Sequence, residues 1–286
     1  MGKERIIIHC DLDAFFASVE ILHHGFPEDE PLIIGSDPMQ GRGRGIVSTC
    51  NYAAREYGVR SAMPISEAWR RCPGHPFGPA RFIRGTRSLY SMASRRVMKI
   101  LRNDADTFEQ ASIDEAYMDV TEKVDGDWDE AMALARRLQR AIYAKVGLTA
   151  SFGIGSTRII AKMSSEVNKP NGIHRVLPDE IQAFFESRSV RDVPGIGPKT
   201  ANVLAEWGKF LGVVLHRGSV QPQLLLVGCP ALYVIPKEQA VFDQKEWSRH
   251  RPKMFGVKQL VGVHQDRKST RLNSSNRCIS YAVFCL

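Results

Sequence analysis

The stretch that decides the fold runs from Phe108 to Val120 and reads FEQASIDEAYMDV. Its apolar and polar residues follow the pattern of a buried strand or a hairpin. Two adjacent acids, Asp114 and Glu115, lie inside this apolar stretch. Burying an ionised carboxylate without a partner costs several kcal/mol or more. A basic side chain, a turn that lifts both acids into water, or a bound metal must therefore offset their charge.

Hydrophobic patterning on both sides of this hairpin predicts further strands and helices. We expect strands at Ile6–Ile8, 31–36 and 148–156, and helices at 14–24, 87–104 and 128–147, with another helix opening at Pro64 and ending before Pro73. The apolar stripe of the 87–104 helix is predicted at Leu89, Met92, Val97 and Ile100 or Leu101. This order of elements indicates an α+β fold with a ferredoxin-like sheet and an insertion after the first strand.

Length and composition bound the class of protein. The 286 residues, 43% of them hydrophobic, suffice for two or three globular domains. The sequence has no 18-residue apolar run and no signal peptide, because Asp11 and Asp13 interrupt the first apolar stretch. Its cysteines form no CxxC pair, so we expect neither zinc nor a disulfide framework, and a reducing, cytoplasmic location.

A net charge of +8 would ordinarily favour nucleic-acid binding, but its distribution along the chain weakens that argument. Residues 1–208 hold 27 basic and 27 acidic side chains, whereas residues 209–286 hold 12 and 4. The whole excess of positive charge therefore lies near the C-terminus. An argument for DNA binding must come from the motifs of residues 1–208.

Asp11, Asp114 and Glu115 are the candidate metal ligands. Asp11 ends the first predicted strand, and the other two acids follow far along the sequence. If the fold gathers these carboxylates at one sheet edge, they form a hard oxygen site suited to Mg²⁺ or Mn²⁺. Two such ions would clamp the attacking and leaving oxygens of a phosphoryl transfer. The alternative is three strand-end acids that face solvent.

A second motif, VPGIGPKTANVLAEWG, extends from Val193 to Gly208. Its PGIG sequence lies between two short helical patterns and predicts a hairpin whose backbone amides suit a phosphate. A plain helical turn is the alternative.

Five ordered motifs now carry a resemblance. They are DLDAFFASVE, STCNYAAREYGVRSAMP, SIDEAYMDVT, TASFGIGSTRIIAKMSSEVNKPNG and VPGIGPKTANVLAEWG. Together they resemble the Y-family translesion DNA polymerases, closest to the DNA polymerase IV/kappa type, over residues 5–208. The resemblance implies a palm at 1–13 and 80–172, small inserted fingers at 14–79, and a partial thumb with a helix-hairpin-helix at 173–208.

The resemblance also implies roles for individual residues. The metal ligands would be Asp11, Asp114, Glu115 and the Leu12 carbonyl, holding two Mg²⁺ ions, with Mn²⁺ as a substitute. Phe16 would exclude a ribose 2′-hydroxyl, and Phe15 beside it is expected in the core. The triphosphate of a deoxynucleotide would meet the remaining candidates, which are Thr49, Tyr52, Arg55 and Lys169, with Ser112 and Lys162 as weaker ones. Primer-template DNA would contact Gly195, Gly197 and Lys199.

The implied activity is template-directed, error-prone DNA synthesis by a monomer. Metal ions would lower the pKa of the primer 3′-hydroxyl and neutralise charge on the α-phosphate, so no side-chain nucleophile is needed. A sliding clamp would be the partner of a full-length member, although its binding peptide is not seen in this sequence.

We expect residues 209–286 to match no part of the family, and the family's little-finger domain to be missing. Two segments, 266–275 and 279–286, resemble translated sequencing-library adapter. We interpret this end as an assembly artefact, accompanied by a frameshift near residue 209 and poorly ordered. A natural basic tail is the alternative.

Two rival functions remain. Nucleotidyl cyclases share a palm and two metals but lack the inserted fingers and the PGIG hairpin. A catalytically silent scaffold, or a nucleotide-binding fragment that cannot hold DNA, is the second rival. The retained acids argue against a scaffold, whereas the missing DNA-gripping domain favours a fragment.

Overall fold

The structure is a computed structural model, and it describes residues 3–206. The expectations for 209–286 lie outside these residues. The chain divides into two compact units, Met1–Arg175 and Val176–Leu286, and each is described by itself. Within the described residues, none of the helices is long and apolar enough to span a lipid bilayer.

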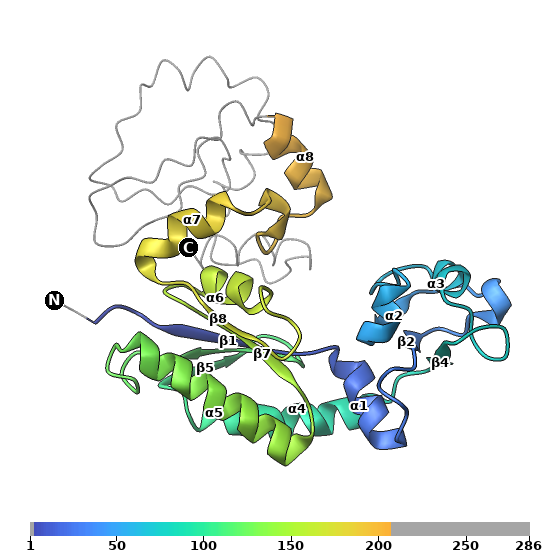
Figure 1. Ribbon diagram of the computed structural model, residues 1–286, viewed down its shortest axis with the longest axis horizontal. Helices are drawn as coiled ribbons and strands as arrows, with labels where there is room; N and C mark the ends of the chain where they lie inside the picture. The colour runs from blue at the N-terminus through green and yellow to red at the C-terminus, as the bar shows by residue number, and fades with distance from the viewer. Residues whose placement is uncertain (1–2, 207–286) are drawn as a thin grey trace, which may run out of the picture. The chain divides into compact units, whose positions relative to one another are not determined.

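A five-stranded sheet forms the centre of the first unit (Figure 1). Its strand order is β5-β6-β1-β7-β8. β1 pairs antiparallel with both β6 and β7, and β8 adds to β7 in parallel. The strands are β1 Ile7–Leu12, β5 Thr107–Gln110, β6 Glu115–Asp119, β7 Ala150–Gly155 and β8 Ile173–Arg175. β1 therefore lies at the centre of the sheet, with two antiparallel neighbours.

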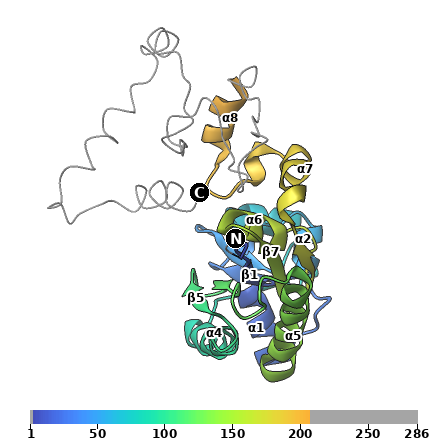
Figure 2. The ribbon, with the colours of Figure 1, turned by 90° about the vertical axis from the view of Figure 1, so that its left-hand side faces the viewer.

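Helices cover both faces of this sheet. α4 (Arg87–Arg102) and α5 (Trp128–Val146) lie against one face, and α6 (Arg158–Ser165) lies against the other (Figures 1 and 2). Alternate side chains of the first strand, from Ile6 to Leu12, enter the core shared with α4 and α5. His9 and Asp11 therefore lie on the opposite face, where α6 packs.

The order β1-α4-β5-β6-α5-β7 places one strand between the two strands of each crossover. β6 lies between β1 and β5, and β1 lies between β6 and β7. This arrangement of two interlocked split β-α-β units belongs to the α+β class. The expectation of a mixed α+β fold is confirmed.

The caps of α5 show how the sequence sets its length. The Asp127 carboxylate accepts hydrogen bonds from the backbone amides of Asp129 and Glu130 at the first turn. Gly147, in a left-handed conformation with φ of 78°, ends the helix. The helix buries one apolar stripe against the sheet, and this stripe ends where the caps end the helix.

α6 packs unusually close to the sheet because β7 carries glycine. A Cβ atom added to Gly153 would lie 2.0 Å from the Ala161 carbonyl oxygen and 2.2 Å from the Ser165 nitrogen. Only glycine permits this approach. It brings the residues of α6 over β1 and β7, and this arrangement supplies two side chains to the candidate site.

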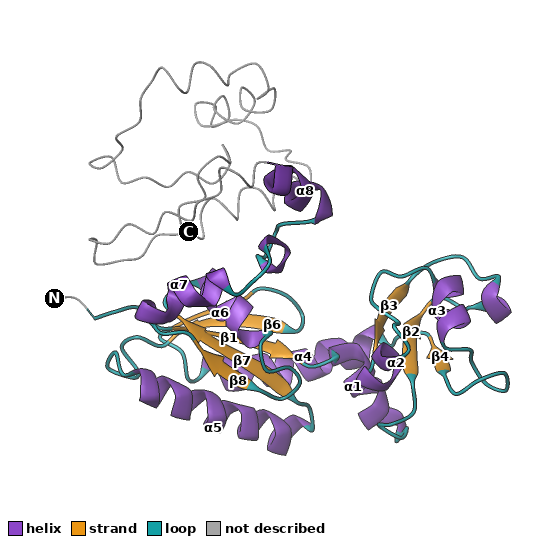
Figure 3. Ribbon diagram, turned by 45° about the horizontal axis from the view of Figure 1, so that its top comes forward, coloured by secondary structure: helices purple, strands orange, loops and turns teal. Residues whose placement is uncertain are grey.

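A second, three-stranded sheet is inserted between β1 and α4 (Figure 3). Its order is β3-β2-β4, and it has its own buried core around Ile33 and Ile65. Its elements, with the helix that precedes it, are α1 Phe15–His24, β2 Leu32–Gly35, η1 Met39–Gly41, β3 Val47–Cys50, α2 Tyr52–Glu56, α3 Ile65–Arg71 and β4 Arg81–Ile83. The predicted insertion after the first strand is therefore present. α1 packs on β2 through small residues, including Ala14 and Ala17.

The predicted strands and helices of residues 1–175 are found close to their expected bounds. One expectation about packing was wrong, because Met92 is 51% exposed. Val97 and Leu101 are buried as predicted, and the buried face of α4 also contains Tyr90, Ser94 and Met98, which the predicted stripe did not include. Ser94 and Tyr90 carry hydroxyl groups, so a search for apolar residues alone does not place them on the buried face.

The described part of the second unit holds short helices. They are η2 Pro178–Glu180, α7 Ile181–Glu186, η3 Val190–Asp192 and α8 Pro198–Glu206. The Ser189 hydroxyl accepts a hydrogen bond from the Arg191 amide and caps η3. The PGIG turn joins η3 to α8.

Candidate active site

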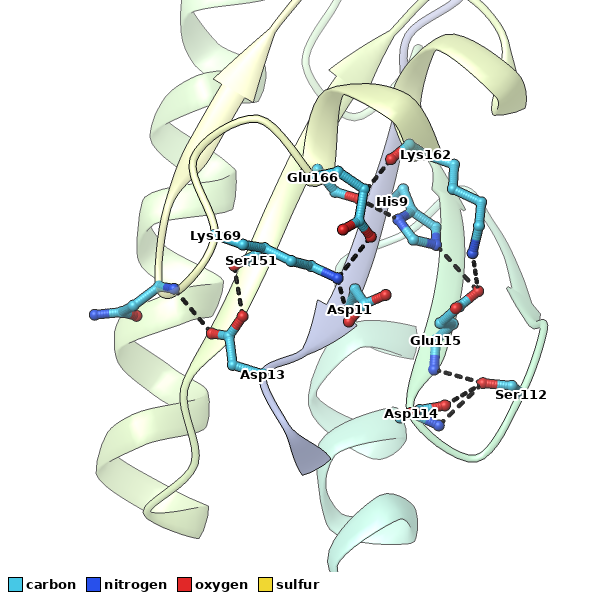
Figure 4. A network of polar contacts seen from close by, with 12 residues as sticks. His9, Asp11, Asp13, Ser112, Asp114, Glu115, Ser151, Lys162, Glu166 and Lys169 are labelled. Carbon is cyan, nitrogen blue, oxygen red and sulfur yellow. Dashed lines mark hydrogen bonds and ion pairs between the residues drawn. The ribbon is translucent and has the colours of Figure 1, made fainter. Parts of the chain in front are cut away.

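Two of the predicted acids face each other across neighbouring strands. Asp11, near the end of β1, is the register partner of Glu115, the first residue of β6. Both side chains lie on the α6 face of the sheet (Figure 4). The Asp11 residue is 9% exposed and Glu115 is partly buried. The fold thus gathers two carboxylates from segments about a hundred residues apart.

Two lysines offset the charge of this pair. The Lys169 ammonium lies 2.9 Å from Asp11 Oδ1 and 2.6 Å from Glu166 Oε1. Lys162, on α6, donates to Glu115 Oε2. The compensating charge that the sequence required is therefore supplied by basic side chains (Figure 4).

Burial dominates the electrostatics of Asp11. Its removal from water raises the pKa of the Asp11 carboxyl to about 7, although the Lys169 ammonium opposes this shift. Burial lowers the pKa of Lys169, but the carboxylates of Asp11 and Glu166 together raise it, and the net pKa is raised. A carboxylate in such a place needs nearby positive charge to stay ionised at neutral pH.

His9 is a third group at this position, and the sequence patterns did not single it out. It lies two residues before Asp11 on the same face of β1 and is fully buried. Its Nδ1 is 2.9 Å from Ser165 Oγ, and burial lowers the pKa of the ring. One ligand atom from each of His9, Asp11 and Glu115 lies within 4.8 Å of the others.

Asp114 and Ser112 are arranged differently from this group. The Ser112 hydroxyl accepts hydrogen bonds from the backbone amides of Asp114 and Glu115, at 3.2 and 3.0 Å, and bonds to the Asp114 carboxylate. The Leu12 amide donates to the Asp114 carbonyl at 3.1 Å. The Asp114 residue thus lies beside the end of β1, with its carboxylate on Ser112 rather than beside Asp11. Ser112 acts here as the cap of the turn.

The residues present fit a divalent cation. Two carboxylates and an imidazole nitrogen lie within 4.8 Å of one another, in a partly buried position with the Leu12 and Asp114 backbones adjacent. Oxygen-rich donor sets of this kind suit Mg²⁺ and Mn²⁺. The ammonium groups of Lys169 and Lys162 already neutralise Asp11 and Glu115, so a bound cation would take over a charge compensation that the site already has.

Asp13 positions Lys169, and it was not predicted as a functional residue. Its side chain is buried and accepts hydrogen bonds from the Ser151 hydroxyl at 2.7 Å and from the Asn171 amide at 2.9 Å. These contacts tie the NKPNG loop to the end of β1 (Figure 4). The second acid of the DLD motif was the available signal, but its partners lie at least 138 residues away.

Phe16 lies on α1 and is partly buried, whereas Phe15 is in the core as expected. The Phe16 ring stacks on Tyr90 of α4, with a centroid separation of 4.2 Å. The Tyr90 hydroxyl donates to the buried Glu20. Two residues that the sequence did not single out therefore fix the orientation of the predicted sugar-gate residue.

Thr49, Tyr52 and Arg55 lie together at the end of β3 and on α2. The Arg55 guanidinium lies 4.5 Å from the centroid of the Tyr52 ring. Burial raises the pKa of Tyr52, and the Asp13 carboxylate adds to this shift. Tyr52 therefore lies within electrostatic range of the acidic site.

A buried asparagine, Asn51, holds the start of α2. Its side-chain oxygen accepts hydrogen bonds from the Leu32 and Ala54 amides, at 2.9 and 3.0 Å. Its amide group donates to the Glu30 carbonyl at 2.8 Å. The NYAAR motif was read for its tyrosine and arginine, yet its first residue anchors both of them to the sheet.

The predicted DNA contacts lie in the second unit. Gly195 is in a left-handed conformation with φ of 89°, and Gly197 precedes the first turn of α8. A Cβ added to either glycine would meet nothing within 4 Å, and Lys199 is exposed. Among residues 3–206, the turn therefore presents an open backbone at a helix N-terminus, and no close contact there requires glycine.

The impB/mucB/samB family matches residues 10–166, more than half of the chain. These residues contain the last three residues of β1, the inserted sheet, the acidic hairpin and α6. The matched region thus includes both carboxylates and Lys162.

Curated relatives of known name are similar to this chain over most of its length. DNA polymerase IV from Methanoculleus marisnigri is 41% identical over 224 residues, which are 78% of this chain and 60% of that relative. DNA polymerase IV from Streptococcus pneumoniae serotype 2 is 43% identical over 211 residues, 74% of this chain and 58% of that relative. The chain spans about three-fifths of the length of these relatives.

Solved structures agree in fold. The crystal structure of DinB from Sulfolobus solfataricus is 36% identical, has a TM-score of 0.64, and is matched over 71% of this chain and 57% of that chain. A structure described as an insertion ternary complex of Dbh DNA polymerase is also 36% identical, with a TM-score of 0.65. The match covers 71% of this chain and 58% of that chain. The chain therefore belongs to the impB/mucB/samB family and is a homologue of the Y-family DNA polymerase IV.

Proposed function

We propose that this protein is an error-prone translesion DNA polymerase that adds deoxynucleotides to a primer 3′-hydroxyl by two-metal phosphoryl transfer. The observation that carries the proposal is the register pairing of Asp11 with Glu115, next to Lys169 and Lys162. Membership of a family that includes DNA polymerase IV supports nucleotide addition as the form of this phosphoryl transfer.

In this proposal the first unit contains a ferredoxin-like palm, at 1–13 and 80–172, with fingers at 14–79. Residues 173–208 form a partial thumb whose helix-hairpin-helix contains the PGIG turn. The four strands β7-β1-β6-β5 and the helices α4 and α5 would be the palm. The inserted three-stranded sheet would be the fingers.

Asp11, Asp114, Glu115 and the Leu12 carbonyl would hold two divalent ions, Mg²⁺ or Mn²⁺. When bound, these ions lower the pKa of an attacking hydroxyl and neutralise charge that develops on the transferred phosphate. The carboxylates orient the ions, and partial burial of Asp11 strengthens this interaction by excluding water. For Asp114, ligation requires its carboxylate to leave Ser112.

The basic side chains would bind the triphosphate. Arg55 offers a planar fork that suits two phosphate oxygens, and Tyr52 beneath it keeps the guanidinium in place. Thr49 and Ser112 would add hydroxyl contacts. Lys169, released from Asp11, would hold the β- and γ-phosphates and the departing pyrophosphate as a point charge.

Phe16 would exclude ribonucleotides by filling the space that a 2′-hydroxyl needs. Its stacking on Tyr90 supports this role, because a gate must resist displacement by the sugar. The exposed amides of Gly195 and Gly197, with Lys199, would contact a DNA phosphate at the N-terminus of α8.

The test is primer extension by the whole chain on an undamaged template with Mg²⁺, beside the double variant Asp114→Ala/Glu115→Ala. Extension by the chain and not by the variant is the expected result. Metal-dependent deoxynucleotide binding without extension would instead favour the nucleotide-binding fragment. If neither extension nor binding occurs in a folded chain, the proposal is wrong.

A further inference from the structure

We propose that His9 is an additional metal ligand in this site, and that its Nε2 atom makes the site prefer a transition-metal ion such as Mn²⁺ over Mg²⁺. The inference deepens the proposed function, on which it rests, because it concerns the ions held by Asp11 and Glu115. Its starting point is the hydrogen-bond geometry around the buried imidazole ring.

The Ser165 hydroxyl determines which ring nitrogen of His9 carries the proton. Ser165 Oγ lies 2.7 Å from the Lys162 carbonyl oxygen and 2.9 Å from His9 Nδ1. A carbonyl oxygen has no hydrogen, so two oxygens this close require the serine hydrogen between them. The serine oxygen can then only accept from the ring, and His9 Nδ1 must be the donor.

Nε2 of a neutral ring protonated on Nδ1 is a lone-pair donor for a metal. In His9 this atom is buried and makes no hydrogen bond within the described residues, although it faces the Glu115 carboxylate (Figure 4). Glu115 Oε2 lies 3.5 Å away, beyond the usual hydrogen-bond range, and it offers no hydrogen to a lone pair. An unsatisfied buried nitrogen is costly, so a native protein gives it a function or an unseen partner.

The surroundings of Nε2 supply the rest of a coordination site. Nε2 lies on the side of the sheet that holds the carboxylates, and the three ligand atoms are within 4.8 Å of one another (Figure 4). An ion about 2.1 Å from each atom needs separations of about 4.2 Å or less. Small side-chain shifts close that difference.

The imidazole ring is already held in the orientation that coordination needs. Its Nδ1–H is bonded to Ser165, and the ring packs at a tilt of 46° against the Tyr117 ring, with centroids 4.6 Å apart. Metal-ligating histidines usually donate their second nitrogen in this way, which fixes the tautomer and raises ligand basicity. His9 therefore has the outer contact typical of a ligand.

The choice of ion follows from ligand chemistry. Mg²⁺ favours oxygen donors and gives up its waters reluctantly, whereas imidazole suits transition-metal ions. A nitrogen added to two carboxylates thus raises affinity for Mn²⁺ more than for Mg²⁺. Asp11 and Glu115 alone would discriminate less.

The experiment uses the whole chain, freed of metal and given one equivalent of Mn²⁺. Electron spin-echo modulation measures whether a nitrogen nucleus is coupled to the bound ion, and a chain labelled with ¹⁵N-histidine identifies that nitrogen as imidazole. We expect imidazole coupling that is lost in His9→Asn and retained in His75→Gln, a surface control. The asparagine variant keeps a polar group near Nδ1 and removes Nε2.

Affinity gives a second readout that does not depend on polymerase activity. His9→Asn should weaken Mn²⁺ binding by about tenfold or more and Mg²⁺ binding by about twofold or less. Equal loss for both ions, or site-bound Mn²⁺ without imidazole coupling in the labelled chain, would overturn the ligand role and leave the proposed function intact. If Mn²⁺ binding is insensitive to Asp11→Asn and Glu115→Gln, the acids do not hold the ion, and the proposed function fails with the inference. Should His9→Asn not fold, the labelled unaltered chain still decides the coupling.

Discussion

The Phe16 ring stacks on the Tyr90 ring, with centroids 4.2 Å apart and planes 14° from parallel. Tyr90 is fixed in turn, because its hydroxyl donates to Glu20 Oε1 at 2.5 Å and accepts from the Thr86 amide at 3.0 Å. Glu20 is fully buried. A pair of aromatic rings anchored by a buried hydrogen bond gives the proposed sugar gate a rigid support.

Phe16→Ala should therefore admit ribonucleotides. Removing the ring opens the space beside the sugar, and selectivity that depends on shape should fall by about one to two orders of magnitude. The measurement is kcat/KM for a deoxynucleotide and for the matching ribonucleotide. Phe77→Ala, which changes an exposed aromatic residue, is the control and should keep the wild-type ratio. Unchanged selectivity in Phe16→Ala would contradict the gate role.

Tyr90→Phe separates stacking from hydrogen bonding. The variant keeps the ring under Phe16 but leaves Glu20 without its hydroxyl donor, so the free energy of unfolding should fall by about 1–3 kcal/mol. Sugar selectivity should change much less than in Phe16→Ala. Urea unfolding followed by circular dichroism measures the first quantity. Full stability together with lost selectivity would show that the hydroxyl acts on the substrate instead.

Asp13→Asn should loosen the loop that carries Lys169. The substituted amide cannot accept from both the Ser151 hydroxyl and the Asn171 amide, which the carboxylate does at present. We expect deoxynucleotide affinity to fall by about tenfold. Because Asp13 acts through Lys169, the effect should be non-additive with Lys169→Ala in a double-mutant cycle. Additive losses would place Asp13 in an independent role.

Asn51→Ala should disturb the helix that carries Tyr52 and Arg55. The change removes the side-chain oxygen that holds the Leu32 and Ala54 amides, and these buried donors lose their partner. Stability should fall by about 2 kcal/mol or more. KM for the nucleotide should rise more than kcat falls, because binding residues move. Asn202→Ala, at an exposed position in the second unit, is the matched control. A variant as stable as the wild type would refute the anchoring role.

Local patterns predicted the sheet well because its strands are strongly apolar. Ile6, Ile7 and Ile8 mark β1, and the alternation around Asp114 marks the β5–β6 hairpin. The same patterns failed at Met92, since α4 instead buries Tyr90 and Ser94, whose hydroxyls bond to Glu20 and Gln110 in contacts that hydropathy does not register. Helix stripes read from apolar residues alone miss such positions.

Sequence motifs identified some residues of the candidate site but missed those whose contacts join distant parts of the chain. Asp11, Glu115 and Lys169 belong to recognisable motifs, and the fold brings them together. His9 and Asp13 were missed because their decisive contacts, to Ser165 and Asn171, join residues 156 and 158 positions apart. Only the sheet register and the docking of α6 create those contacts.

The central claim is that Asp11 and Glu115 hold the ions used for nucleotide addition. The most direct measurement is the single-turnover rate of incorporation against Mg²⁺ concentration, for the whole chain and for Asp11→Asn and Glu115→Gln. The control is Glu109→Gln, which changes an exposed acid on β5 that pairs with Arg158 of α6. We predict a loss of about a thousandfold or more in the two site variants, with a near wild-type rate in the control. Incorporation by Asp11→Asn or Glu115→Gln at the wild-type rate and Mg²⁺ dependence would contradict the account.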